Sequence, residues 1–221
     1  MGFLFESQCF TTQEPLNKCL SAEAGYTRPA SIRVSWLAMS RFVALFRGLN
    51  VGGKNKVPMS PLQRCLEELG FANVLTYIAS GNVILNSDKD ADEIKSMIEG
   101  ALPKQFDLDN EIVKVLVLTD EQLRAVVENR PPGFGGQPDT YHSDAIFLID
   151  IDVSRAMPIF SPREGVDSIW AGDGVIYSQR LSSQRTKSRL NKIMGTPEYR
   201  SMTIRSWNTT IKLLEMIETN P

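Results

Sequence analysis

The fold is set by residues 41–70, RFVALFRGLNVGGKNKVPMSPLQRCLEELG, where the patterns of a strand, a glycine loop and a helix follow one another directly. Arg41–Arg47 alternates between apolar and other side chains, as a half-buried strand does. Ser60-Pro61 provides an N-cap and a proline in the first helical turn, and Gly70 ends the helix. We therefore expect a strand–loop–helix unit that opens a mixed α/β domain.

The residues that follow extend this unit. Two β-rich runs, 74–78 and 83–85, are separated by a short turn and predict a hairpin. Asp90 and Glu93 form a capping box before a second helical pattern, and residues 112–118 read as a last strand. The order β-α-β-β-α-β is the split βαβ arrangement of ferredoxin-like folds.

The second half repeats this order with a less regular sequence. Strands are expected at 145–151, 168–171, 175–178 and 202–206. Helices or helical turns are expected after the capping box Thr119/Gln122, at 154–157, at 184–194 and at 207–218, and Pro131–Gly136 reads as a plain loop. We predict an α+β protein with two ferredoxin-like (βαββαβ, α/β plait) domains in tandem, 39–118 and 119–221, and an added C-terminal helix.

Residues 1–38 differ from the rest of the chain, because they show neither a strand nor a helix period. We interpret them as a poorly ordered extension, with Met39 close to the natural start. The alternative, an organelle-targeting segment, is disfavoured by three acidic residues within it. The three cysteines have no CxxC spacing, and no apolar stretch has the length of a membrane span. A cytoplasmic location without a membrane anchor is expected.

Charge is distributed unevenly along the chain, although its net value is only −2. Residues 41–64 contain five Lys or Arg and no acid, and residues 180–212 contain eight Lys or Arg against Glu198 alone. Between these two basic islands, residues 65–179 contain twenty acids and eight bases. Basic islands in an acidic chain favour contact with an anionic partner.

The glycine loop is the strongest candidate site. Its glycines leave backbone N–H groups open to a ligand, and its lysines add positive charge. The predicted ligand-binding residues are Arg47, Asn50, Gly52, Gly53, Lys54, Lys56, Ser80, Asn82 and Arg205. The alternative is a structural turn whose lysines only solvate it.

A P-loop is not expected, although the spacing from Gly48 to Lys54 imitates one. Asn55 stands where Ser or Thr would coordinate magnesium, and the helix pattern begins too late to face a phosphate. An RNA-recognition module shares the β-α-β-β-α-β order, but its third strand should present aromatic side chains, and residues 83–85 contain none.

The sequence gives little indication of a metal site, a catalytic group or base stacking. His142 is the single histidine, so no metal site is expected, and no motif of a nucleophilic enzyme occurs. No cofactor is expected. Asp150 and Asp152 are better explained as the polar end of a buried strand than as an acid/base pair. Trp207 and Tyr177 could stack on a base, but core positions are the more common use of such residues.

The motifs RGLNVGGKNKVPM (47–59) and LGFANVLTYIASGNVIL (69–85) resemble the opening signature of a bacterial domain-of-unknown-function family, DUF1697. Later elements, including TIRSWNTTIKLLE (203–215), extend the resemblance over about residues 41–218. This chain has Ala79 where Gln is usual, and Ser206 where Asn is usual. The resemblance implies two α/β plaits and brings no catalytic residue.

Three functions remain open from the sequence. The leading hypothesis is a protein that binds a phosphate-bearing partner, nucleotide or nucleic acid, through the loop 47–56 and the basic region 180–205. The second is an enzyme that acts on a small anionic metabolite in a pocket beside the loop. The third is a scaffold for protein interactions.

Overall fold

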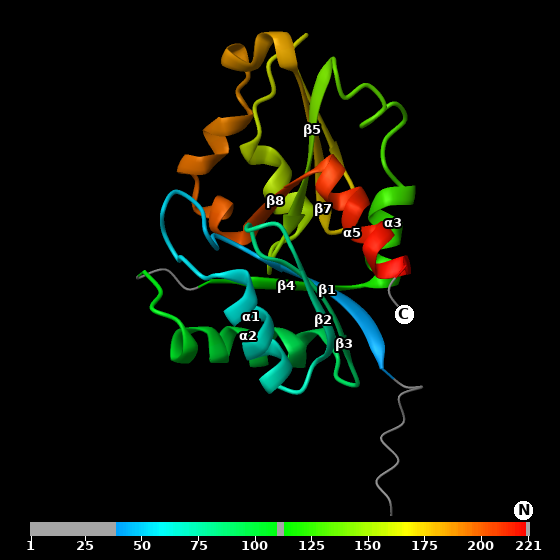
Figure 1. Cartoon of the computed structure of the whole chain (residues 1–221). Helices are drawn as coiled ribbons and strands as arrows, with labels where there is room; N and C mark the ends of the chain where they lie inside the picture. The colour runs from blue at the N-terminus through cyan, green and yellow to red at the C-terminus, as the bar shows by residue number, and fades with distance from the viewer. Residues whose placement is uncertain (1–38, 110–112, 220–221) are drawn as a thin grey trace, which may run out of the picture. The chain divides into compact units, whose positions relative to one another are not determined.

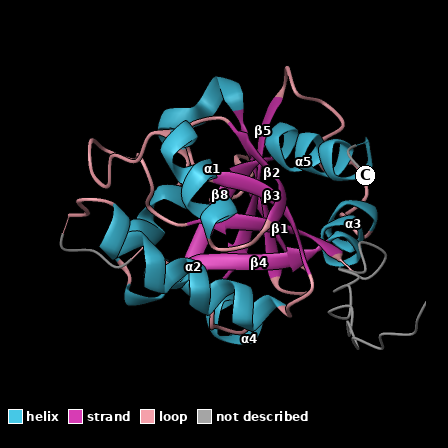
Figure 2. Cartoon of the chain, turned by 60° about the horizontal axis from the view of Figure 1, so that its bottom comes forward, coloured by secondary structure: helices cyan, strands magenta, loops and turns pink. Residues whose placement is uncertain are grey.

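The computed structural model describes residues 39–109 and 113–219. Two four-stranded sheets lie at its centre, and every strand pair in them is antiparallel. Helices surround the strands (Figure 1, Figure 2). The mixed α/β class predicted from the sequence is confirmed. The expected N-terminal extension, with Cys9 and Cys19, lies outside the described residues.

The first sheet has the strand order β2-β3-β1-β4. Its strands are β1 (Ser40–Phe46), β2 (Ala72–Tyr77), β3 (Asn82–Ser87) and β4 (Val115–Thr119). β1 is central, because it is hydrogen-bonded to β3 on one side and to β4 on the other. The end of β1 therefore lies beside the start of β3 and the start of β4, which places the glycine loop next to the β2–β3 hairpin.

Two helices cover one face of the first sheet. They are α1 (Met59–Glu68) and α2 (Ala91–Gln105), and their buried apolar residues pack on alternate residues of β1. The predicted capping box of α2 is confirmed, since Asp90 and Glu93 bond each other's backbone N–H. The predicted cap of α1 is wrong: its N-cap is Pro58, with no side-chain bond, and Ser60 and Pro61 lie inside the first turn. Proline is tolerated there because the first-turn N–H groups have no helical acceptor.

The second sheet has the equivalent order β6-β7-β5-β8. Its strands are β5 (Tyr141–Leu148), β6 (Asp167–Ala171), β7 (Val175–Leu181) and β8 (Met202–Ser206). A four-residue helix, α4 (Val153–Ala156), and the 3₁₀ turn η2 (Met157–Ile159) follow β5. The final helix is α5 (Trp207–Thr219), capped by the Ser206 hydroxyl, which accepts the N–H of Thr209.

The continuous basic helix predicted at 184–194 is wrong. The chain instead forms three 3₁₀ segments, η3 (Ser182–Lys187), η4 (Leu190–Gly195) and η5 (Pro197–Ser201). Ser188 separates the first two, because its backbone is extended and its hydroxyl accepts the N–H of Leu190. Serine side chains compete with helical hydrogen bonds in this way, and a helical charge pattern does not reveal it.

A core shared by the two halves lies between the two sheets. It contains the face of β1 that α1 and α2 leave uncovered, the inner face of the second sheet, and residues of α3 (Asp120–Glu128) and α5. Val43 and Leu45 of the first sheet are fully buried there, as are Ala145 and Phe147 of the second. The outer face of the second sheet packs against α4, η2 and η4.

The junction between the halves has no linker. Thr119 is the last residue of β4 and also the N-cap of α3, where it forms the predicted capping box with Gln122. All described residues belong to one compact unit. The division into two domains, 39–118 and 119–221, stays a prediction.

Candidate functional site at the glycine loop

The glycine loop, residues 47–58, joins β1 to α1 and has a tight turn at its tip. The N–H of Lys54 donates to the carbonyl oxygen of Val51 at 3.1 Å and closes this turn. Its central residues, Gly52 and Gly53, have φ values of +61° and +80°. Left-handed backbone at both central positions defines a type I′ turn, which glycine adopts at low steric cost. The two glycines are therefore required by the turn itself.

Two asparagines fix the base of the loop. The Asn50 amide donates to the carbonyl oxygens of Val57 and Ala79, each at 2.8 Å, and its Oδ1 accepts the N–H of Val57 at 2.8 Å. The buried Asn55 donates its Nδ2 to the Gly48 carbonyl oxygen at 3.1 Å. Both asparagines have positive φ, which asparagine tolerates better than most residues. Side-chain amides thus hold the loop in shape.

Asn50→Gly tests this anchoring. Glycine adopts the same φ freely, so the change removes the side-chain bonds and leaves the groups of Val57 and Ala79 without their partners. The free energy of unfolding is expected to fall by about 1–3 kcal/mol in urea titrations. Asn129→Gly, at an exposed helix end, serves as the control and should change it by no more than about 0.5 kcal/mol. Equal effects of the two variants would contradict the anchoring role.

Asn55 and its acidic partner, Asp109, were not among the site residues predicted from the sequence. The backbone N–H of Asn55 donates to the Asp109 carboxylate at 2.6 Å. Asp109 is 54 residues away in the sequence, so no local pattern pairs it with the loop. The Asn55 side of the loop therefore contacts a carboxylate of the chain itself.

The tip is exposed. Val51 has 59% of its surface accessible, and Gly52, Gly53, Lys54 and Lys56 are also exposed. Of the predicted residues, Gly52, Gly53 and Lys54 lie on this short turn, and Lys56 follows it. They do not line an enclosed cavity there, but stand out as a cationic protrusion on a fixed base.

Arg47 is separated from the tip lysines. Its Nε donates to the carbonyl oxygen of Tyr199 at 3.3 Å, and its Cζ lies 5.4 Å from the centre of the Tyr199 ring. This cation–π contact connects the end of β1 to η5 in the second half of the chain. Arg47 is half-buried and contributes to the contact between the halves.

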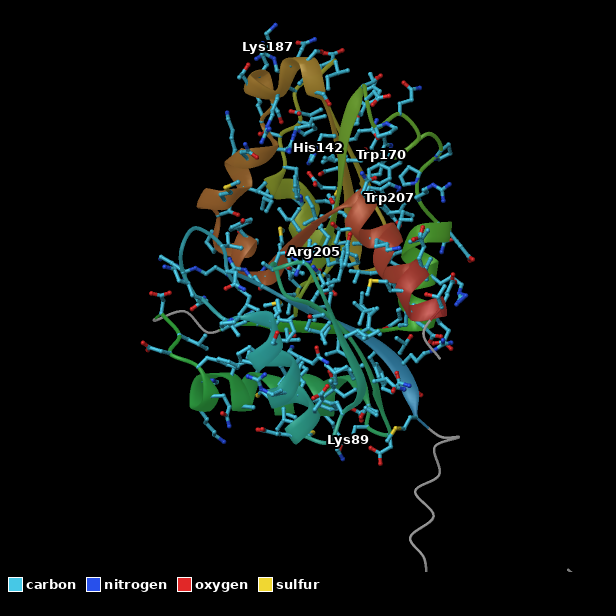
Figure 3. The ribbon with its side chains drawn as sticks, in the orientation of Figure 1. Lys89, His142, Trp170, Lys187, Arg205 and Trp207 are labelled. Carbon is cyan, nitrogen blue, oxygen red and sulfur yellow. The ribbon has the colours of Figure 1, made fainter. Side chains whose placement is uncertain are left out.

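Arg205 lies in the interior, in the middle of the structure (Figure 3). Only 6% of it is exposed, and it donates to the carbonyl oxygens of Phe46 (2.8 Å), Gly81 (3.1 Å) and Ser80 (3.2 Å). Its remaining bonds go to Thr203 Oγ1, to the Ile204 carbonyl oxygen and, through Nε, to Asn82 Oδ1. Burial lowers the pKa of Arg205 to about 10, so the side chain stays charged at neutral pH.

The hairpin turn before β3 is held by the same contacts. Asn82 is fully buried, and its Nδ2 donates to the Tyr77 carbonyl oxygen and to the Ser80 hydroxyl. A Cβ at Gly81 would lie 2.7 Å from the Cβ of Phe46, so the turn rests directly on β1. Of the predicted site residues, Asn82 and Arg205 thus form a buried group beneath the loop, while the lysines lie on its surface.

The positive charge of the second basic island, residues 180–212, is partly neutralised by an acidic side chain. Arg180 lies 3.7 Å from the carboxylate of Asp144, and both side chains are largely buried. Trp207 and Tyr177 are core residues, as the more common use of such residues suggests, because both contact the Phe134 ring edge to face. A base could not stack on rings that are covered in this way.

Asp150 has an ion-pairing role at the end of the second sheet. It lies 2.6 Å from Lys95 of α2 and 3.7 Å from Lys114. The hydrogen bond from Lys95 lowers the pKa of Asp150. Asp150 thus joins the polar end of the β5 segment to the first half.

Residues 39–109 and 113–219 contain neither a metal-binding cluster nor a membrane-spanning helix. No group of three or more His, Cys, Asp or Glu side chains in these ranges is arranged to hold a metal ion. None of the helices described there has the length and apolarity needed to cross a bilayer. Cys65, in α1, is a buried free thiol whose pKa is raised by burial.

Comparison with known proteins gives one family and a related structure. No curated protein matches the chain. The structure of the conserved bacterial protein SP0830 from Streptococcus pneumoniae is similar, with a TM-score of 0.69 and 28% identity. The match covers 81% of this chain and 99% of that protein. The family pattern described as "Protein of unknown function (DUF1697)" matches residues 39–177, which include the glycine loop, the whole first sheet and most of β5–β7. The chain belongs to this family of unknown function.

Proposed function

We propose that the protein binds a phosphate-bearing partner, a nucleic acid or a nucleotide, through the loop tip, residues 51–56. The observation that supports this most directly is the combination of an exposed turn with two lysines and a base fixed by asparagine amides. A rigid cationic turn loses little conformational entropy when it meets an anion, which favours binding. Backbone N–H groups near Gly52 and Gly53 add short-range donors to the lysine charge.

The buried members of the predicted site have a supporting role in this proposal. Arg205 uses its donors on carbonyl oxygens and on Asn82, so it would position the hairpin beside the loop without touching the ligand. Asn82 and Ser80 would act in the same way. The proposed contact residues are therefore Gly52, Gly53, Lys54 and Lys56.

An extended partner suits the tip better than a small metabolite does. A protruding turn can reach successive phosphates of a nucleic acid backbone, whereas a metabolite enzyme needs an enclosed site that excludes water. Among the alternatives, an interaction scaffold gains some support from Val51 and Ile78. Both are exposed apolar residues, and the bond from Asn50 to Ala79 brings their two loops together.

Binding measurements test the proposal. Fluorescence anisotropy with labelled single-stranded RNA, single-stranded DNA, duplex DNA and ATP should show binding at low salt that weakens as salt rises. The double change Lys54→Ala/Lys56→Ala is expected to weaken binding to every sequence alike. For a single strand, the slope of log K against log salt should shrink by about 0.7 for each phosphate that a lysine no longer neutralises.

The matched control removes the same charge elsewhere. Lys89→Ala/Lys104→Ala deletes two lysines outside both basic islands and should leave binding and its salt slope unchanged. If the two double variants bind equally well, nonspecific charge explains the binding and the loop is not the site. Absence of binding to all four probes at low salt would also end the proposal.

We also propose that the two sheets are ferredoxin-like plaits in tandem, divided near residue 119, in a cytoplasmic protein. The matching strand orders β2-β3-β1-β4 and β6-β7-β5-β8 support this. In the second half, short 3₁₀ segments replace the second helix of the plait. Superposition of 40–119 on 141–206 in a crystal structure tests the repeat, and cell fractionation tests the location.

A further inference from the structure

The segments η3, η4 and η5 carry a dense group of exposed cations. Residues 182–201, the basic stretch, contain five Lys or Arg and a single acid, Glu198. All five cationic residues are exposed: Arg185, Lys187, Arg189, Lys192 and Arg200. The Glu198 side chain is only 21% exposed, and its Oε1 lies 4.0 Å from Arg155, which is outside the stretch. The one acid of the basic stretch therefore leaves most of its positive charge open to solvent.

The backbone of the basic stretch is held firmly on the protein. Leu190 and Ile193 of η4 are buried in the core on the outer face of the second sheet. Where η3 meets η4, the Asp167 carboxylate accepts the N–H of Arg189 at 2.8 Å and the N–H of Arg163 at 3.0 Å. The cationic side chains therefore extend from a backbone that is already ordered, so a partner does not have to order it on binding.

The basic stretch meets the glycine loop at η5. Arg47, the first residue of the loop, donates to the carbonyl oxygen of Tyr199 in η5 and lies against the Tyr199 ring. Figure 1 shows the orange segments η3–η5 and the cyan loop on the same side of the ribbon. Figure 3 shows Lys187 at the far end of the basic stretch, away from Arg205 beneath the loop. The two cationic regions are thus joined at η5, and the basic stretch leads away from the loop.

A nucleic acid strand fits two cationic regions that are joined in this way. It carries one phosphate per nucleotide, so different phosphates of one strand can contact the loop tip and the basic stretch at the same time. A mononucleotide has its phosphates in one group and can contact only one of the two regions. We propose that the basic stretch is a second contact surface for the nucleic acid that binds the loop tip, and that one strand runs across both. This inference rests on the proposed function of the tip.

The length of the strand tests the proposal. Fluorescence anisotropy on the full-length protein compares labelled single-stranded DNA of about 4, 8 and 20 nucleotides, in mixed sequence, over a range of salt concentrations. From the shortest to the longest strand, the slope of log K against log salt should steepen by about 0.7 for each further phosphate that is neutralised. The slope decides the test, because a longer strand also offers more positions for binding. The same slope at all three lengths would overturn the inference.

Two double variants show whether one strand contacts both regions. Lys187→Ala/Lys192→Ala removes two exposed lysines of the basic stretch, and Lys54→Ala/Lys56→Ala removes those of the tip. If a single strand crosses both regions, each variant should weaken binding of the longest strand at least about fivefold at low salt. If the regions bind separate strands, either one still binds when the other is disabled. Each variant would then lower the overall affinity no more than about twofold, which would overturn the inference.

The inference and the proposed function can fail separately. The control Lys89→Ala/Lys104→Ala removes two lysines outside both basic islands and should bind every strand as the unchanged protein does. If the tip variant weakens binding while the variant of the basic stretch matches this control at every length, the tip is the whole site and only the inference fails. If the tip variant matches the control, the proposed function of the tip fails, whatever the basic stretch does.

Discussion

Replacing Arg205 by methionine is expected to lower the free energy of unfolding by about 3–5 kcal/mol. The change keeps most of the side-chain volume but removes every donor of a guanidinium that is only 6% exposed. The carbonyl oxygens of Phe46, Ser80 and Gly81 would then be buried without this partner. Each such group costs about 1–3 kcal/mol when it is left unsatisfied. Urea unfolding followed by circular dichroism measures the decrease.

Arg205→Lys distinguishes charge from geometry. Lysine restores the positive charge but lacks the planar fork that reaches Asn82, Thr203 and the hairpin carbonyls together. We expect this variant to remain clearly destabilised, by more than about 1 kcal/mol. Arg64→Met, on the exposed surface of α1, is the control and should stay within about 0.5 kcal/mol. A stability of Arg205→Met near that of the control would show that the buried bonds contribute little.

Phe134→Ala is expected to lower the free energy of unfolding by about 3–5 kcal/mol, as large core truncations do. Phe134 is 2% exposed, and its ring contacts the rings of Trp170, Tyr177 and Trp207 edge to face at 5.0–6.0 Å between centroids. The change would open a cavity at the centre of this aromatic cluster. The near-ultraviolet circular dichroism of the folded variant should also weaken.

Phe134→Leu provides the graded comparison. Leucine fills much of the space but gives no ring contacts, so a smaller decrease of about 1–2 kcal/mol is expected. Phe106→Ala is the matched control, because it removes a partly buried ring that packs against the other core. Phe134→Ala should cost more than Phe106→Ala. The reverse order would argue against a central role for the aromatic cluster.

Local patterns predicted the elements that local contacts determine. The alternation around Phe42 and Phe46 identified β1, and the capping boxes Asp90/Glu93 and Thr119/Gln122 identified the starts of α2 and α3. In each case the residues that interact are close in the sequence. These elements also indicated the mixed α/β class, whereas the order of the strands within each sheet was not predicted.

Contacts between distant residues could not be predicted in the same way. Arg205 and Asn82 are 123 residues apart in the sequence. Nothing in the sequence around either residue indicates that the charged Arg205 side chain is buried against Asn82. Phe134 lies in a segment rich in glycine and proline, PPGFGG, which has every sign of a surface loop. The segment is indeed irregular, but its one large apolar side chain is inserted into the core.

Only part of the candidate site could be predicted from the sequence. The glycines and lysines of the tip were identified together, whereas Asn55 and Asp109 were not, because their role depends on a backbone shape that the sequence does not show. Asn55 could have indicated a left-handed backbone position after Lys54, because asparagine is one of the few residues that adopt positive φ readily. Ligand contact by the predicted residues stays a prediction.

The junction at Thr119 has a consequence for how this protein can change over evolutionary time. One residue both finishes β4 and caps α3, and Val43 of the first sheet shares a core with Phe147 of the second. Recombination at Thr119 would transfer one half of the chain without the other half, whose side chains complete the shared core. The two halves are therefore expected to be inherited together and to accumulate compensating substitutions across the shared core, and neither is suited to exchange as a module between unrelated proteins.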